Sequence, residues 1–413
     1  MKKKKILEIF LGVMTALGGF VDLGQIVFTT QAGALFGCKL LWAILLGAVG
    51  IILYMEMCGR VAVVAREPVF AVVRTRLGDR LGLVTLIASN LLNLITCAAE
   101  IGGLAILLHL LTGWPERAVL IGSCLALAAL IYLCSFQWIE RTFGLSGLLM
   151  IVFAVSAAAL HPDWRQLIAG LNPAPAASGR HALLLYAYFA VGIFSAMLME
   201  YEVHFYSSGA IEEDWKVKDL GENFMVAALG SILGSLLTVA LMMLGAILFM
   251  PRQIFPQLLS TAVMAGAFPF SDKALVIALI GAMACIGGAA IETALSGAYN
   301  VCQFFNFGWG KYRPARDVPV FTAGWLGMLA LALIIAVTGV RPLTLVNISI
   351  VFGMVVMPLT YYPILRTGAD RNVMGKHVNS KVISVLGAIF LVLITGAAAA
   401  AIPLMILTHG GQP

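Results

Sequence analysis

Long apolar runs, broken only by short polar stretches, are the feature that most restricts the folds open to this chain. In lipid, each backbone polar group must be bonded within the protein, and a helix needs about 20 apolar residues to cross the bilayer. With 61% hydrophobic and 11% charged residues, the chain cannot be a water-soluble globule. The sequence therefore predicts an all-α polytopic membrane protein with a single membrane domain over residues 1–413. Eleven spans are expected, near residues 6–28, 38–64, 82–112, 117–136, 145–161, 182–207, 223–250, 273–304, 319–339, 343–365 and 382–407.

The distribution of positive charge predicts how the chain is oriented. Lys and Arg are retained on the cytoplasmic side during insertion. If Lys2–Lys5 are inside, 19 of the 26 Lys and Arg fall in inner loops or helix ends. The formal charge of +6 therefore reflects topology and not a nucleic-acid partner. We predict a multi-pass protein of the cell (inner) membrane with a cytoplasmic N-terminus and an outer C-terminus.

Two of the apolar segments carry polar interruptions at bilayer depth. One is Asp22-Leu23-Gly24-Gln25 in the first segment, and the other is Glu200-Tyr201-Glu202 after Met199 in the sixth. Polar groups at this depth are tolerated where they face protein or a binding cavity. The matching interruptions suggest two inverted repeats, near 6–161 and 182–365, followed by an extra helix at 382–407. In such repeats the substrate site lies near the membrane midplane.

The residues at the two interruptions offer ligands for a metal ion. Asp22 and Gln25 supply a carboxylate and an amide oxygen, Met199 supplies a thioether sulfur, and Ala196 supplies a backbone carbonyl if the helix opens there. Hard oxygens with one soft sulfur suit Mn, Fe, Co or Cd better than Mg or Ca. A purely structural role remains open for Met199, because most methionines fill gaps in helix packing.

The first segment resembles the Nramp family of divalent metal transporters. Residues 19–37, GFVDLGQIVFTTQAGALFG, are similar to the family pattern D-P-G-N followed by Q-A-G-A and F-G, and residues 195–201 occupy the place of its G-A-x-x-M-P-H. The resemblance implies that Asp22 and Met199 are metal ligands, that Ala196 contributes its carbonyl, and that Gln25 replaces the family's Asn. It also implies the leucine-transporter fold, with a 5+5 inverted repeat plus an eleventh helix. Members of the family usually import manganese or iron together with protons.

Three departures from the family pattern bear on the mechanism. Leu23 replaces the family's proline, so unwinding of the first helix is expected to depend on Gly24 and on polar groups that need partners. Tyr201 replaces its histidine, and Cys97, three residues before Glu100, replaces an aspartate of the proton route. A phenol and a thiol are poor proton carriers near neutral pH. These replacements argue against proton coupling of the family's kind.

Acidic residues near the second interruption that the family pattern lacks leave three interpretations open. Glu200, Glu202 and His204 form a shifted proton path, or the two carboxylates help to hold a harder cation, or Glu202 and His204 are solvated near the inner interface. Solvation is the favoured interpretation for His204. Glu100 is expected to belong to a proton or salt-bridge route, with Arg313 or Arg316 as its partner by resemblance.

The leading prediction is a secondary transporter that imports a divalent transition metal by alternating access. The metal is its substrate, no cofactor is implied, and the chain has no G-x-x-x-x-G-K-[ST] loop for ATP. Lipid and the metal ion are the expected partners, with protons left open. The alternatives are a relative that carries Mg²⁺ or an organic solute, and a membrane receptor without transport. An enzyme is not expected, because a lone His204 cannot complete a catalytic zinc site.

Overall fold

Helices account for the regular structure in this computed structural model, which describes residues 21–174 and 179–412. In chain order they are α2 (Leu23–Phe36), α3 (Leu41–Ala65), α4 (Val69–Thr112), α5 (Glu116–Leu133), α6 (Phe136–Gly147), α7 (Ile151–Ala159), α8 (Trp164–Ala169), α9 (Arg180–Met197), α10 (Glu200–Glu212), α11 (Leu220–Leu244), α12 (Leu259–Met264), α13 (Asp272–Phe305), α14 (Pro319–Val337), α15 (Pro342–Gly368), α16 (Arg371–Met374) and α17 (Lys381–Leu407).

Ten helical segments of the described chain are long and apolar enough to cross a membrane, and they match the second to eleventh predicted spans. The fifth of the predicted spans begins earlier than expected, because α6 and α7 run together across Phe136–Ala159. The first predicted span, near 6–28, starts outside the described residues, as do Lys2–Lys5. Its described part does not stop at residue 28 but continues as α2 to Phe36.

The third span differs from its prediction because α4 is 44 residues long and contains a kink. At Gly78 the backbone has φ 75° and ψ 173°, a conformation that side chains other than hydrogen rarely allow. The kink separates Val69–Leu77 from the predicted span near 82–112. Arg74, Arg76 and Arg80 lower the hydropathy around this glycine, so hydropathy alone did not predict the first part of the helix.

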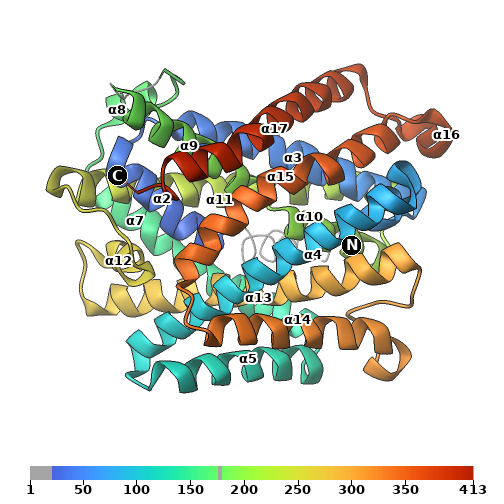
Figure 1. The fold of residues 1–413 in the computed structure, drawn as a ribbon, viewed down its shortest axis with the longest axis horizontal. Helices are drawn as coiled ribbons and strands as arrows, with labels where there is room; N and C mark the ends of the chain where they lie inside the picture. The colour runs from blue at the N-terminus through green and yellow to red at the C-terminus, as the bar shows by residue number, and fades with distance from the viewer. Residues whose placement is uncertain (1–20, 175–178, 413) are drawn as a thin grey trace.

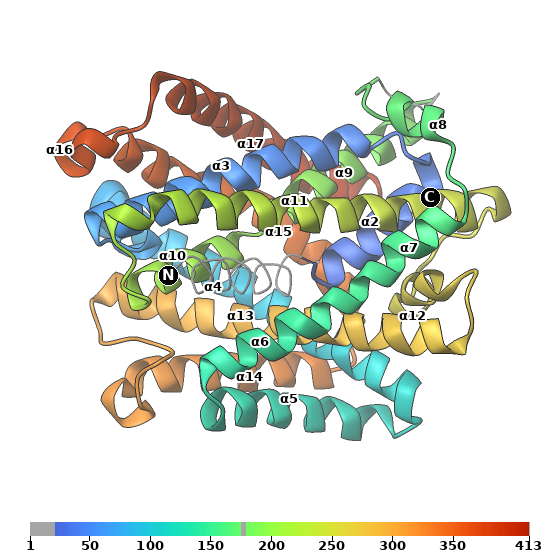
Figure 2. The same cartoon turned by 180° about the vertical axis from the view of Figure 1, so that it is seen from behind.

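The long helices lie side by side along the longest axis of the molecule (Figures 1 and 2). In both views α8, α12 and the end of the chain lie at one end of the bundle, whereas α16 lies at the other. This placement agrees with the predicted alternation of loops between two faces. Burial distinguishes inner helices from peripheral ones. In the most apolar 18-residue stretch of each segment, 72% of residues are buried in Arg180–Glu212 and in α13, but only 22% in α17.

The helix α2 packs against α11 with almost no side chains between the backbones. A Cβ atom added at Gly33 would lie 2.1 Å from the Met242 carbonyl oxygen, and one added at Gly245 would lie 2.2 Å from that of Thr30. Small residues allow helices to approach this closely in lipid. The pair of glycines therefore sets the position of α2 in the bundle.

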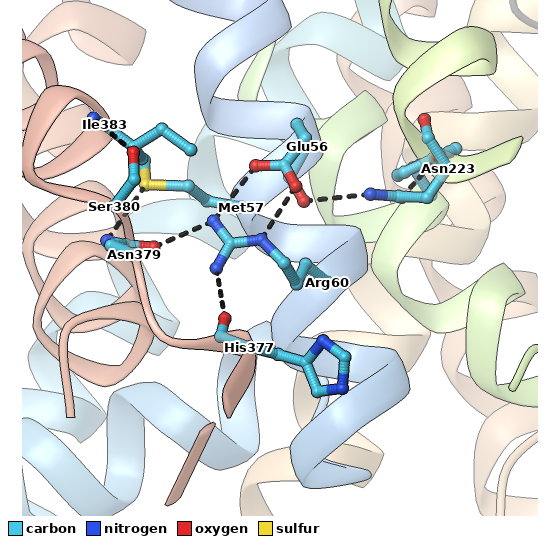
Figure 3. Close-up of polar contacts among 9 residues, drawn as sticks. Glu56, Met57, Arg60, Asn223, His377, Asn379, Ser380 and Ile383 are labelled. Atoms are coloured by element: carbon cyan, nitrogen blue, oxygen red, sulfur yellow. Dashed lines mark hydrogen bonds and ion pairs between the residues drawn. The ribbon is translucent and has the colours of Figure 1, made fainter. Parts of the chain in front are cut away.

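A buried arginine joins α3 to the segment before α17 (Figure 3). Glu56 and Arg60 are four residues apart on α3 and form an ion pair, with Arg60 Nε 2.7 Å from Glu56 Oε1. Arg60 also donates to the His377 carbonyl at 2.8 Å and to Asn379 Oδ1 at 2.8 Å. On the other side, Asn223 of α11 donates to the Glu56 carbonyl at 3.1 Å. The network anchors α3, the helix that runs beside both α9 and α10.

Candidate functional site

The first break lies immediately before α2 and is stabilised by two carboxylates. Asp22 is the N-cap residue, and its Oδ1 accepts from the Gln25 N–H at 2.8 Å. The Leu23 N–H donates to both oxygens of Glu100 on α4, at 3.2 and 3.3 Å. Gly24 lies inside the helix, so the part of the expectation that assigned the unwinding to Gly24 is wrong, whereas the part that assigned it to unsatisfied polar groups agrees with the capping seen here. Capping by carboxylates satisfies the free N–H groups of the first turn instead.

The second break separates α9 from α10 at Leu198 and Met199. The helix α9 ends at Met197, and Met199 has φ 1° and ψ 89°, far from helical values. The helix resumes at Glu200. The predicted interruption of the sixth segment is thus present, and it leaves the Ala196 carbonyl free to accept a bond from outside its own helix.

The two breaks meet in the interior of the bundle. Gln25 Nε2 donates to the Ala196 carbonyl at 3.1 Å. The Tyr201 hydroxyl lies 3.5 Å from Asp22 Oδ2 and 3.3 Å from the Met199 sulfur. The structure therefore brings together Asp22, Gln25, Ala196 and Met199, with Tyr201 between the carboxylate and the thioether. All of them are buried.

One oxygen at this meeting point has no partner. Gln25 is 1% exposed, and its Oε1 accepts no hydrogen bond from any residue that the structure describes. A buried polar atom without a partner is costly, and such atoms often mark a ligand site. Within the described ranges, no group of three or more His, Cys, Asp or Glu residues is arranged to hold a metal. A metal site here would therefore need the mixed oxygen and sulfur set of the two breaks.

The residues that follow Tyr201 are buried, which corrects one prediction. Glu202 is 3% exposed and His204 is 1% exposed, so neither is solvated at an interface. The helix α10 is enclosed by α3, α4 and α13, and sequence alone could not show this packing. Glu200 Oε1 accepts from Ser89 of α4 at 2.7 Å and lies 3.6 Å from His204 Nε2.

Two residues of α4 predicted for a proton or salt-bridge route have other contacts. Glu100 caps Leu23, and Arg316 is not its partner, because the Arg316 side chain is 87% exposed and pairs with Asp317 at 3.6 Å. Cys97 lies against the Ala290 carbonyl of α13, with its sulfur 3.7 Å from the oxygen. The capping role of Glu100 had no signal in the sequence, since it depends on a contact between residues 77 positions apart.

A cavity of about 300 Å³ leads from the first break toward one end of the bundle. Leu23, the neighbour of Asp22, forms part of its wall, together with Gly102 of α4. Arg341 and Gln257, from loops at that end of the bundle, line it as well. In the predicted orientation this end faces outward. The break at Asp22 is thus close to an aqueous approach from that side.

The opposite end is closed by a buried lysine. The Lys311 side chain is 3% exposed, and its Nζ lies 3.2 Å from Glu140 of α6 and 3.8 Å from Glu213 beyond α10. It also lies 4.0 Å from the Phe136 ring centre and 4.5 Å from that of Phe205. Burial lowers the pKa of Lys311, but the surrounding carboxylates outweigh burial and raise it above its ordinary value. A charged lysine therefore ties α6 to α10 at this end.

Comparisons with known proteins agree with this architecture. Residues 12–403 match the family described as "Natural resistance-associated macrophage protein-like", abbreviated Nramp. The chain is 23% identical to the divalent metal cation transporter MntH of Bacillus subtilis, over 93% of this chain and 91% of that protein. It is 26% identical to MntH 1 of Pseudomonas aeruginosa, over 93% of this chain and 88% of the relative.

Solved structures show the same fold. The manganese transporter of Eremococcus coleocola superposes with a TM-score of 0.72 at 19% identity, covering 98% of this chain and 87% of that one. Mhp1, a nucleobase-cation-symport-1 family transporter, superposes with a TM-score of 0.57 at 15% identity, covering 97% of this chain and 92% of the other. The predicted leucine-transporter-like fold is confirmed by these neighbours.

Proposed function

This chain belongs to the Nramp family, and from that premise we propose that it is a secondary transporter that imports a divalent transition metal such as Mn²⁺ or Fe²⁺. The relatives named above are divalent metal cation transporters, and the chain covers nearly their whole length. The proposed ligands are the carboxylate of Asp22, the amide oxygen of Gln25, the carbonyl of Ala196 and the sulfur of Met199.

The unpartnered Gln25 oxygen between the two helix breaks is the observation that carries this assignment. Its Nε2 is held by Ala196, so its amide plane is fixed while Oε1 stays free to bind a cation. A carboxylate lies one helical turn away on the same break, and a thioether lies on the other. Hard oxygens and one soft sulfur favour a transition metal over Mg²⁺ and Ca²⁺.

Alternating access follows from where the ligands are attached. One pair belongs to the start of α2 and the other to the junction of α9 and α10, so relative movement of these segments opens and closes the site. The outer cavity beside Leu23 offers the entry route, and Lys311 closes the opposite end. Release to that end requires Lys311 to part from Glu140 or Glu213.

Uptake is proposed to run without the family's proton route. Tyr201 takes the place of the titrating imidazole, and its hydroxyl contacts Asp22 and Met199. The Cys97 sulfur lies 3.7 Å from the Ala290 carbonyl oxygen. An outward-to-inward pH gradient imposed on proteoliposomes should leave the initial rate of Mn²⁺ uptake unchanged. A rate that follows the gradient would refute this part of the proposal.

Radiolabelled Mn²⁺ uptake into proteoliposomes tests the site. Asp22→Ala and Met199→Ala should each reduce uptake severely. Asp79→Asn and Met225→Ala are matched controls, because both side chains are exposed and lie away from the breaks. Unchanged uptake in both site variants would show that the assigned ligands are wrong.

Competition distinguishes transition-metal cargo from a harder cation. Glu200 and Glu202 add negative charge near the site and favour magnesium, whereas Met199 favours softer ions. With Met199 as a ligand, Cd²⁺ should block Mn²⁺ uptake at far lower concentrations than Mg²⁺ does. Equal potency of the two ions would favour the altered-cargo alternative.

A further inference from the structure

Two buried carboxylates beyond the metal site have no partners in the part of the chain that the structure describes. Glu202 of α10 is 3% exposed, and neither of its oxygens accepts a hydrogen bond. Glu292 of α13 is 8% exposed, and its Oε2 is likewise unpartnered. Burial of ionisable groups without partners is expensive. These two side chains are not used by the proposed midplane ligands.

A hydrogen bond between α10 and α13 sets the register that brings the two carboxylates together. Ser296 Oγ donates to the Tyr201 carbonyl at 2.6 Å. Glu202 follows Tyr201 directly, and Glu292 lies one helical turn before Ser296 on the same face of α13. Glu292 and Asp22 are accordingly the two acidic groups within electrostatic range of Glu202.

The positions of other charges place this pair between the midplane site and the closed end of the bundle. Glu202 interacts with Asp22 on one side, whereas Glu292 interacts with Lys311 and Glu140 on the other. Lys311 does not neutralise the pair, because its ammonium group is held by Glu140 and Glu213. The remaining nearby groups, Tyr201 and Cys285, carry no positive charge.

The local backbone stabilises negative charge on Glu202, although not on Glu292, which lies in the middle of α13. Glu202 lies in the first turn of α10, where the helix dipole stabilises negative charge. Two carboxylates with free oxygens can hold one divalent cation through oxygen alone, and the ion neutralises both charges. This donor set differs from that of the midplane site, which includes sulfur.

We propose that Glu202 and Glu292 form a second divalent-cation site, with oxygen ligands only, on the route from the midplane site to the Lys311 end. The inference rests on the proposed function for the identity of the cation, which is the transported metal in transit. Because its ligands are hard, this site should bind both Mn²⁺ and Mg²⁺. Preference for Cd²⁺ is expected only at the midplane site, which includes a sulfur ligand.

Equilibrium dialysis of the full chain in nanodiscs with radiolabelled Mn²⁺ measures the number of bound ions. The wild type should bind two ions per chain. The double variant Glu202→Gln/Glu292→Gln should bind one, because the amides keep the shape of the side chains but remove their charge. Asp272→Asn is the matched control, an exposed carboxylate on the same helix α13, and it should bind two.

A second pair of substitutions separates this proposal from the assignment of the midplane site. Asp22→Ala/Met199→Ala should lose one ion and keep the other, and Glu202→Gln/Glu292→Gln introduced into that background should abolish binding. One bound ion in the wild type, or two in the Glu202→Gln/Glu292→Gln variant, overturns the second site. Two ions in Asp22→Ala/Met199→Ala instead overturn the midplane assignment.

Infrared difference spectra keep the proposal testable if the double glutamine variant does not fold. Adding Mn²⁺ to the Asp22→Ala/Met199→Ala protein should shift a carboxylate stretching band, and Glu292→Gln alone should remove that shift. A spectrum without any carboxylate change on addition of Mn²⁺ overturns the second site.

Discussion

Removal of the Glu100 carboxylate should weaken metal binding although Glu100 is not a proposed ligand. Both of its oxygens accept from the Leu23 N–H, at 3.2 and 3.3 Å, and the side chain is 1% exposed. In Glu100→Ala this N–H loses its partner beside Asp22. The start of α2 at Leu23 is then less stable, and the Asp22 carboxylate is no longer held in position.

The size of the effect follows from the strength of the bond. A hydrogen bond to a charged group contributes about 1.5–3 kcal/mol. If this free energy stabilises the metal-binding conformation, in which α2 begins at Leu23, its loss reduces the population of that conformation by about 10- to 100-fold. The apparent Kd for the metal then rises by the same factor. Removing a negative charge near the site acts in the same direction. Glu100→Gln keeps an acceptor oxygen and should fall between the wild type and Glu100→Ala.

Isothermal titration of purified protein with Mn²⁺ measures these affinities. Asp79→Asn serves as the control, because it removes an exposed carboxylate from the same helix α4. Size-exclusion profiles establish that each variant is folded. An apparent Kd within twofold of the wild type in folded Glu100→Ala would refute the view that the cap positions Asp22.

Three further predictions concern the site and its frame. Met199→Leu removes the sulfur but keeps an apolar side chain, so Cd²⁺ affinity should fall by about tenfold or more, equivalent to about 1.4 kcal/mol, while Mg²⁺ affinity changes little in titrations. Gly33→Ala places a Cβ 2.1 Å from the Met242 carbonyl oxygen and should destabilise the fold by about 3 kcal/mol in thermal or denaturant unfolding; Gly122→Ala, with nothing within 4 Å, should not destabilise it. Lys311→Met removes the cation shared by the half-buried Glu140 and the more exposed Glu213, and should cost about 1–3 kcal/mol at pH 7. The pKa of Lys311 is raised from 10.5, so its contribution to stability is complete below pH 10.5 and is lost as the pH rises through the folded-state pKa. The free energies of unfolding of the wild type and Lys311→Met should therefore converge at high pH and not at low pH.

Hydropathy and residue type were enough to predict the ten described membrane helices and the interruption of the sixth segment. Apolar runs of about 20 residues have few alternatives in lipid, because every backbone polar group must be bonded within the segment. Asp22 was proposed as a ligand for a related reason, since a carboxylate at bilayer depth needs a compensating contact, whereas Met199 was proposed mainly from the resemblance to the family.

Contacts between helices far apart in the sequence settled what these local rules left open. Polar demand at the start of α2 was expected from the sequence, but its partner Glu100 was not, because that contact requires α4 to lie against α2. The burial of Glu202 and His204 depends on three helices around α10, and the approach of Glu202 to Glu292 depends on the register set by Ser296 and Tyr201. The local sequence determines whether a segment is stable as a helix in lipid. The burial and partners of a polar side chain depend instead on helices that are distant in the sequence and adjacent in space.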